Sequence, residues 1–197
     1  MEKRIRVGKL EKLRETLSNM NAVARLQWAD YLFGRKAVAT ACLGADCAVL
    51  LHMLAEASPQ SRVFVVAPGD SSQETQSAVA EMERRLGLSV TLLDPWAPTQ
   101  NVSSSHVDSG DALVLALDDA FCWISDRRKD QAPERIGTTV LERLEDGLYQ
   151  LNPLFDWSQA EVNTYREQHG LPKPAHNAWH AGTNPLKAYD ALQPSGH

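Results

Sequence analysis

A group of cations follows directly on an apolar run near residue 125. Residues 121–124 read Phe-Cys-Trp-Ile and are bulky and apolar, which is typical of a short buried strand. Arg127, Arg128 and Lys129 come next, and Arg135 follows a few residues later. Guanidinium groups hold sulfate and phosphate through paired hydrogen bonds, and ligands of open α/β sheets bind at the carboxyl ends of strands. The segment therefore predicts an anion site, with a solvated run of charges as the alternative interpretation.

A second candidate anion site lies earlier in the chain. Residues 37–43 are small, β-branched and apolar, and Gly44-Ala45-Asp46 separates them from the apolar residues 48–55. This pattern predicts a strand, a tight turn and a buried helix. Such a turn points backbone N–H groups and the positive end of the helix dipole at the ligand site, which suits phosphate or sulfate. The alternative is an ordinary strand-to-helix turn without a ligand.

Strands and helices alternate over most of the remaining chain. Further strands are predicted for residues 62–66 and 89–93, and helices for residues 10–33 (one or two helices), 72–86, 109–119 and 158–169. In the last helix we expect Ser158 as the N-cap, with Glu161 at the third helical position. The alternation favours an α/β fold with a doubly wound, mostly parallel sheet. Residues 140–144 and 148–151 flank Glu145-Asp146-Gly147, and we expect them to form a hairpin or strand pair that closes over the site.

Length and composition limit the function classes. With 197 residues and 43% apolar content, the chain can bury one full core. A net charge of −5 favours neither nucleic-acid binding nor an acidic membrane surface, and no apolar stretch approaches the length of a membrane span. We expect a soluble cytoplasmic protein, with a homo-oligomer left open. The expected organisation is an N-terminal helical segment, an α/β domain and an extended tail, in residues 1–34, 35–170 and 171–197 respectively.

Cysteine and histidine usage argues against a resident metal or cofactor. The chain has three cysteines, an odd number without a Cys-x-x-Cys pair, so neither a disulfide framework nor a four-thiolate iron–sulfur cluster is supported. His176 and His180 lack the helical context and neighbouring ligands of a metal pair. We therefore predict no cofactor and no metal.

Two stretches resemble motifs of the phosphoadenylyl-sulfate and adenylyl-sulfate (PAPS/APS) reductases. The family segment Trp-x-x-Gly-x-Arg-Arg-(Asp/Glu)-Gln-Ser, with Arg shortly after, is matched by Trp123, Arg128, Lys129, Asp130, Gln131 and Arg135. Asp126 stands where the family has Gly, and Ala132 where it has Ser; an added carboxylate weakens an anion site electrostatically. The family motif Asn-Pro-Leu-x-Asp-Trp is matched by residues 152–157, where we expect Asn152 and Trp157 to be structural.

Two further stretches are similar to family motifs in a reduced form. The modified PP-loop, Ser-x-Gly-x-(Asp/Gln)-(Ser/Ala/Val), is matched by Cys42, Gly44 and Asp46, with Cys47 next. The pattern Leu-Asp-Thr-Gly followed by Glu-Thr keeps its glycine at Gly69. The resemblance implies an adenine nucleotide alpha hydrolase-like (PP-loop) fold. The nucleotide-binding residues that it implies are Cys42, Gly44, Asp46, Cys47, Gly69, Arg128, Lys129, Gln131 and Arg135.

The resemblance also implies a function in sulfate assimilation, with an adenylyl sulfate nucleotide as ligand. In the family, a cysteine in a Glu-Cys-Gly-x-His segment attacks the sulfate sulfur, and thioredoxin or glutaredoxin releases sulfite. No cysteine follows Cys122 in this sequence, so we expect the chain by itself not to reduce sulfonucleotides and assign no catalytic residue. Cys47, at the start of a predicted helix, is the one stand-in nucleophile. The alternatives are a non-catalytic nucleotide-binding relative, a subunit of a larger assembly and, more remotely, an adenylating PP-loop enzyme.

Overall fold

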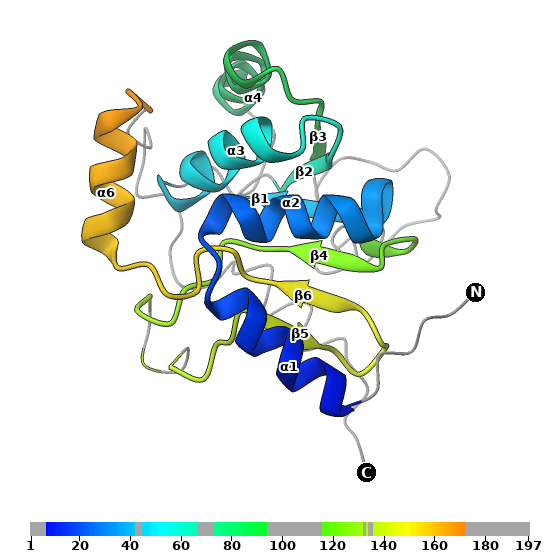
Figure 1. Cartoon of the computed structure of the whole chain (residues 1–197). Coiled ribbons are helices and arrows are strands. Elements are labelled where there is room, and N and C mark those ends of the chain that lie inside the picture. The colour runs from blue at the N-terminus through cyan, green and yellow to red at the C-terminus, as the bar shows by residue number, and fades with distance from the viewer. Residues whose placement is uncertain are drawn as a thin grey trace.

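A central six-stranded sheet organises the chain in the computed structural model, which describes residues 7–41, 45–66, 73–93, 116–131, 133 and 136–171 (Figure 1). The strand order is β3-β2-β1-β4-β6-β5, and every neighbouring pair is parallel except β5 with β6. The strands are β1 (Ala37–Ala41), β2 (Arg62–Val66), β3 (Val90–Leu93), β4 (Cys122–Ile124), β5 (Leu141–Arg143) and β6 (Tyr149–Leu151). The predicted mostly parallel sheet is confirmed.

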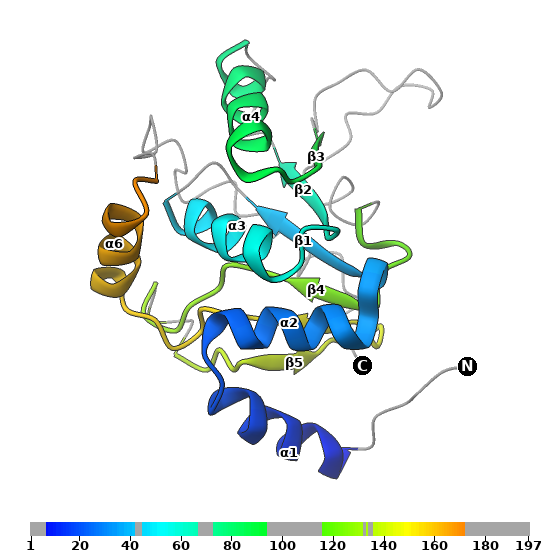
Figure 2. The same ribbon diagram turned by 45° about the horizontal axis from the view of Figure 1, so that its top comes forward.

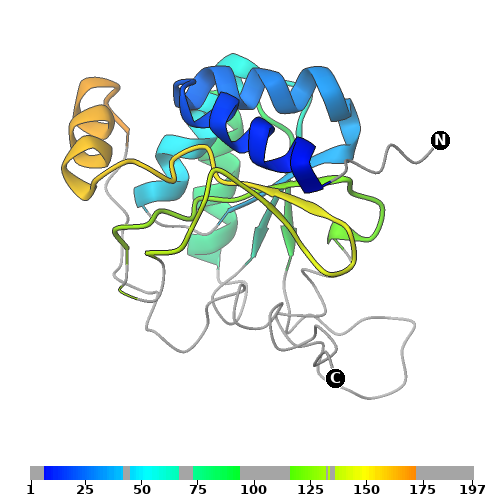
Figure 3. The same ribbon diagram turned by 60° about the horizontal axis from the view of Figure 1, so that its bottom comes forward.

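Helices cover one face of this sheet and share a core with it (Figures 2 and 3). They are α1 (Val7–Ser18), α2 (Ala22–Phe33), α3 (Ala45–Ala57) and α4 (Gln73–Leu86), with a short 3₁₀ turn at Gly34–Lys36. The last helix, α6 (Gln159–Gln168), stands to the side of the sheet and packs against α3 (Figure 1). The predicted helical stretch 10–33 is two helices, because Asn21 caps the second by accepting a hydrogen bond from the Ala24 amide at 2.8 Å. Neither helix is a separate layer, since Leu17 and Leu26 are fully buried in the common core.

The opposite face of the sheet has a smaller apolar cluster of its own. It consists of Val38, Leu117, Trp123 and Leu148, with Phe64 packed against it. Residues 116 and 117 are helical and lie at the end of the predicted helix 109–119, whose other positions up to 115 lie outside the described residues. Apolar side chains therefore pack on both faces, as a doubly wound sheet requires.

The hairpin of β5 and β6 differs in position from our expectation. Glu142 pairs with Gln150 in an antiparallel register, and Gly147 supplies the left-handed turn residue at φ 91°. However, β6 pairs in parallel with β4, so the hairpin lengthens the sheet at its edge instead of closing over the cationic loop. The expectation that this hairpin closes over the site was wrong, because Tyr149 and Leu151 are buried as part of the central sheet.

No helix in the described part of the chain is both long and apolar enough to cross a membrane. The expected extended tail, residues 171–197, lies beyond the described residues except for Leu171.

Candidate functional site

The order of the strands places a topological switch point between β1 and β4. From β1 the chain proceeds through α3 to β2 on one side, whereas β6 and β5 lie on the other side of β4. The two strands run in parallel, with Ala37 opposite Cys122 and Ala39 opposite Ile124, so their carboxyl ends lie together. Ligands of open α/β sheets bind at this place. We call the carboxyl ends of β1 and β4, with the segments that follow them, the switch point.

A side-chain contact joins the first turn of α3 to the segment that follows β4. Cys47, in the first turn of α3, is fully buried, and its Sγ donates a hydrogen bond to Oδ2 of Asp126 at 3.2 Å. Asp126 follows β4 in the cationic loop, residues 125–131. This contact brings the start of α3 and the cationic loop next to each other.

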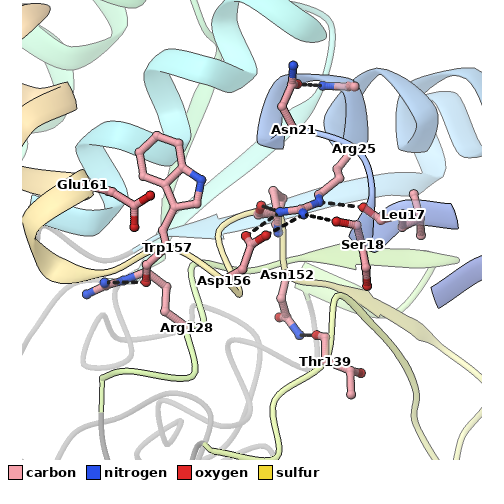
Figure 4. Close-up of polar contacts among 12 residues, drawn as sticks. Leu17, Ser18, Asn21, Arg25, Arg128, Thr139, Asn152, Asp156, Trp157 and Glu161 are labelled. Atoms are coloured by element: carbon pink, nitrogen blue, oxygen red, sulfur yellow. Dashed lines mark hydrogen bonds and ion pairs between the residues drawn. The ribbon is translucent and has the colours of Figure 1, made fainter. Parts of the chain in front are cut away.

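Arg128 is buried in the cationic loop and is held by polar groups on both sides. Its side chain is 1% exposed and forms an ion pair with Asp130, in which the distance from Nη1 of Arg128 to Oδ1 of Asp130 is 2.7 Å. The guanidinium also donates to the carbonyl of Trp157 at 3.2 Å (Figure 4) and to Oε1 of Gln159 at 2.7 Å. Asp130 accepts a further hydrogen bond from the Gln159 amide at 2.7 Å. Arg128 and Asp130 thus fasten the cationic loop to the first turn of α6.

The other polar residues of this loop have different surroundings. Gln131 bridges the loop internally: its Oε1 accepts from the Arg128 amide and its Nε2 donates to the Asp126 carbonyl, both at 3.2 Å. Lys129 is exposed, with its ammonium 5.9 Å from the centre of the Phe155 ring. Arg127 is half-buried and donates to Oε1 of Gln150 at 3.3 Å. Among the described cations of the loop, Lys129 is the most accessible.

The segment 152–157 is a chain reversal that contacts the cationic loop and helps to hold it in place. Asn152 is fully buried; its amide nitrogen donates to the Thr139 carbonyl at 2.8 Å, and its oxygen accepts from Ser125 Oγ at 2.7 Å. Trp157 is half-buried and makes an edge contact with Tyr165. The capping box predicted at Ser158 and Glu161 is present and begins α6 immediately afterwards.

Arg25 is a component of this support that the sequence analysis did not identify. Only 1% of the side chain is exposed, and the guanidinium holds both carboxylate oxygens of Asp156, at 2.7 and 2.9 Å (Figure 4). It also donates to the carbonyls of Leu17, Ser18 and Pro153. A lone arginine among the apolar residues of a predicted helix was the available signal, because a buried cation requires a partner elsewhere in the chain.

An aromatic cluster fixes α6 against α3. His52 Nδ1 lies 3.0 Å from the Tyr165 hydroxyl, and the Tyr165 ring stacks on His169 with centroids 4.1 Å apart. Burial lowers the pKa of His52, His169 lowers it further, and Glu56 acts in the opposite direction. Because α3 begins at the switch point and α6 holds Arg128, this cluster links the two sides of the site.

The structure leaves several predicted site residues unplaced. Asp46 lies in α3 beside Cys47, which the structure does bring to the cationic loop. Cys42, Gly44, Gly69 and Arg135 lie outside the described residues, so their part in the site stays a prediction. Within the described residues, no group of three or more His, Cys, Asp or Glu side chains could hold a metal ion.

Residues 36–176 match the family described as the phosphoadenosine phosphosulfate reductase domain. The chain belongs to this family. Among curated relatives, the phosphoadenosine 5'-phosphosulfate reductase of Alkalilimnicola ehrlichii is 28% identical over 193 residues, covering 89% of this chain and 78% of that protein. The adenosine 5'-phosphosulfate reductase of Salinibacter ruber is 29% identical over 170 residues, covering 78% and 68%. The predicted membership of the PAPS/APS reductase family is confirmed.

Solved structures share the fold at low sequence identity. The phosphate complex of phosphoadenylyl-sulfate reductase from Candida auris has a TM-score of 0.67 at 19% identity, and the match covers 88% of this chain and 92% of that one. The NH3-dependent NAD synthetase from Campylobacter jejuni has a TM-score of 0.54 at 12% identity, with coverage of 82% and 73%. This PAPS reductase family member therefore has the predicted adenine nucleotide alpha hydrolase-like (PP-loop) fold.

Proposed function

We propose that this chain binds an adenylyl sulfate nucleotide, with or without a 3'-phosphate, at the switch point and acts in sulfate assimilation. The observation that carries the proposal is the hydrogen bond between Cys47 and Asp126, which brings the start of α3 to the cationic loop. Both segments lie within residues 36–176, the part of the chain that matches the reductase family. A sulfonucleotide has two anionic groups, and this juxtaposition offers a helix N-terminus on one side and cations on the other.

The proposed contacts divide between the two sides of the switch point. On the α3 side they are Cys42, Gly44, Asp46 and Cys47, with Gly69 after β2. On the loop side, Lys129 and Arg135 are proposed as contacts, and Arg128 and Gln131 as the residues that shape the loop. The exposed Lys129 can meet an anion as the loop stands, whereas Arg128 and Gln131 act by holding the loop in shape.

We further propose that neither described cysteine supplies the thiolate for reduction. Cys122 is fully buried in β4, and burial raises the pKa of its thiol. The Cys47 thiol is also fully buried and donates a hydrogen bond to a carboxylate, whereas a reactive thiolate is stabilised by neighbouring cations. This observation favours nucleotide binding without reduction by these two thiols, either as a non-catalytic relative or as a subunit that receives its thiol from another chain.

Calorimetry with adenylyl sulfate, its 3'-phosphorylated form and ATP tests the binding proposal. We expect one or both sulfonucleotides to bind more tightly than ATP. Lys129→Ala should weaken that binding roughly threefold to tenfold, the order of one partly solvated charge-assisted hydrogen bond. Lys9→Ala, an exposed lysine of α1, is the matched control and should leave the affinity unchanged. Equal affinity for all three nucleotides, or none, would overturn the proposal.

A sulfite assay tests the second part. Purified protein is incubated with each sulfonucleotide and reduced thioredoxin or glutaredoxin, and both sulfite and protein S-sulfonate are measured. We expect no sulfite that depends on Cys47 or Cys122. Sulfite release that disappears in Cys47→Ser would identify Cys47 as the nucleophile and refute this part of the proposal.

A further inference from the structure

The guanidinium of Arg127 uses little of its hydrogen-bonding capacity. Its Nη1 donates to Oε1 of Gln150 at 3.3 Å, and within the described residues it makes no other hydrogen bond and no ion pair. The side chain is half-buried, and its Nε atom is buried without a partner in the part of the chain that the structure describes. A buried donor without a partner is costly and rare in native proteins, so it indicates a group that the chain itself does not supply, such as a ligand or a water molecule.

The contact with Gln150 shows which face of the sheet Arg127 reaches. Gln150 stands in β6 between Tyr149 and Leu151, which both belong to the main core. Because successive side chains of a strand point to opposite faces, Gln150 points to the other face, as does Trp123, its partner in β4 and a member of the smaller apolar cluster. Nη1 of Arg127 therefore lies on the face opposite the main core.

Buried polar groups on this face hold the Arg127 guanidinium in position. Gln150 is fully buried, and its Nε2 donates to Oγ of Ser125 at 3.1 Å, while Ser125 donates to Oδ1 of Asn152 at 2.7 Å. With Nε2 engaged in this way, Oε1 of Gln150 is directed to Nη1 of Arg127. The contact leaves open the edge of the guanidinium that Nε and Nη2 form together. Two donors along one edge of a guanidinium match two oxygens of a sulfate or phosphate group.

No described carboxylate neutralises Arg127. Glu142 lies opposite Gln150 in the register of β5 and β6 and so shares this face of the sheet, but its Oε1 accepts from the Thr139 amide at 3.2 Å. It forms no ion pair with Arg127. A half-buried cation without an anion is unfavourable, and a ligand that brings the anion gains charge-assisted hydrogen bonds that the described residues do not make.

We propose that Arg127 is a further anion-binding residue of the switch point, and that its Nε and Nη2 together bind one sulfate or phosphate group of the ligand. Arg127 is the third residue after β4, at the end of the strand where ligands of open sheets bind. The family segment Trp-x-x-Gly-x-Arg-Arg leaves this position unspecified. The inference rests on the proposed function and deepens it, because it adds a contact to those already proposed.

The test compares two Arg127 variants with a matched control at the other end of a strand. Arg127→Met removes the charge and keeps much of the side-chain length, whereas Arg127→Lys keeps the charge without the paired donors. Arg35→Met is the control, because Arg35 is exposed in the 3₁₀ turn just before β1, at the amino end of that strand. Calorimetry at low and constant ionic strength measures binding of adenylyl sulfate, its 3'-phosphorylated form, inorganic sulfate and inorganic phosphate to each protein.

We expect Arg127→Met to bind at least one sulfonucleotide roughly tenfold to hundredfold more weakly than the wild type, which is the order of a charge-assisted, paired hydrogen bond. Arg127→Lys should lie between the two, and Arg35→Met should stay within about twofold of the wild type. A loss for both nucleotides assigns Arg127 to the phosphosulfate group. A loss confined to the 3'-phosphorylated form assigns it to the 3'-phosphate.

A thermal unfolding midpoint verifies that each variant is folded. Should Arg127→Met not fold, Arg127→Lys carries the test, with an expected loss of about threefold or more. Equal losses in Arg127→Met and Arg35→Met would mean that only net charge matters, which overturns the inference.

The outcomes separate this inference from the proposed function. If both sulfonucleotides bind the wild type and Arg127→Met equally, the proposed function stands and the inference is refuted. If neither sulfonucleotide binds, but inorganic sulfate or phosphate binds the wild type and not Arg127→Met, the proposed nucleotide is wrong and the inference stands. If the wild type binds none of these anions, the switch point is not an anion site and both are refuted.

Discussion

The buried Arg25 and the partly exposed Asp156 form a two-pronged ion pair between α2 and the segment that leads into α6, although 131 residues separate them in the chain. The same guanidinium ties the end of α1 and the Pro153 carbonyl to this pair. The chain reversal 152–157, which in turn contacts the cationic loop through the Trp157 carbonyl, is therefore anchored to the N-terminal helices. The N-terminal helices therefore help to position the candidate site.

Breaking the Arg25 pair should destabilise the whole fold. Arg25→Ala leaves the Asp156 carboxylate and three backbone carbonyls without their donor. Because Asp156 is partly exposed to solvent, we expect a loss of about 3 kcal/mol, at the lower end for a buried ion pair that loses one partner. Urea unfolding followed by circular dichroism measures this loss. Arg84→Ala removes an exposed arginine that pairs with Glu81 and should leave stability close to that of the wild type, because solvent screens this pair. Similar losses in the two variants would contradict the role assigned to Arg25.

Arg128 should matter more for the shape of the loop than as a direct ligand. Arg128→Ala removes the ion pair between this buried guanidinium and the partly exposed Asp130, and we expect a loss of about 2–3 kcal/mol in unfolding free energy. Gln159→Ala removes one acceptor of the same guanidinium and should cost about 1 kcal/mol. Chemical denaturation of both variants gives the values. If Arg128→Ala abolishes nucleotide binding at unchanged stability, Arg128 contacts the nucleotide directly and its main role is not to shape the loop.

Asn152 is expected to be a structural residue. It is fully buried and joins β4, through Ser125, to Thr139 just before β5. Asn152→Ala leaves the Thr139 carbonyl and the Ser125 hydroxyl without this partner, which should cost about 2–3 kcal/mol. The thermal midpoint and nucleotide affinity are measured together. A stable variant that loses affinity alone would instead make Asn152 part of the ligand site.

The stability of the α3–α6 contact should depend on pH through His52. Burial lowers the pKa of His52, so the unfolded chain takes up a proton before the native protein does. This contribution is present above the ordinary histidine pKa of about 6.5 and is lost as the pH falls through the lower native value. Unfolding free energies of the wild type and His52→Gln, measured between pH 8 and pH 5, should show a shallower decline in the variant. An identical pH slope in both proteins would contradict the assignment.

Cys47 and Cys122 should resist alkylation in the native protein. Both side chains are fully buried, and burial raises the pKa of the Cys122 thiol. Iodoacetamide treatment followed by peptide mass spectrometry should leave both unmodified until denaturant is added. Modification of native Cys47 within minutes would show that the first turn of α3 opens, and would revive its candidacy as a nucleophile.

Local patterns in the sequence were sufficient for the elements and for family membership. Apolar runs predicted β1, β2, β3 and β4, and Ser158 with Glu161 predicted the start of α6. The family match over residues 36–176 agrees with the motifs around Trp123 and Asn152. These features succeed because the residues that determine them are neighbours in the chain.

Contacts between segments that are distant in the chain could not be predicted from local sequence patterns. That Arg128 turns toward α6, that Asp126 reaches Cys47 and that Arg25 holds Asp156 all depend on contacts between distant segments. The hairpin was placed wrongly for the same reason, since its two strands and turn are local but its pairing with β4 is not. A run of charges shows which side chains are available; only the fold decides which of them pair with one another.

The bond from the Gln159 amide to Asp130 means that a residue of the cationic loop completes the N-terminal turn of α6. Neither part keeps its contacts if the other detaches, because Arg128 loses Trp157 and Gln159 at the same moment. The loop and the helix should therefore open as one cooperative unit. In native-state hydrogen exchange, the amides of Lys129 and Gln159 should share one opening free energy, lower than that of the β1 amides.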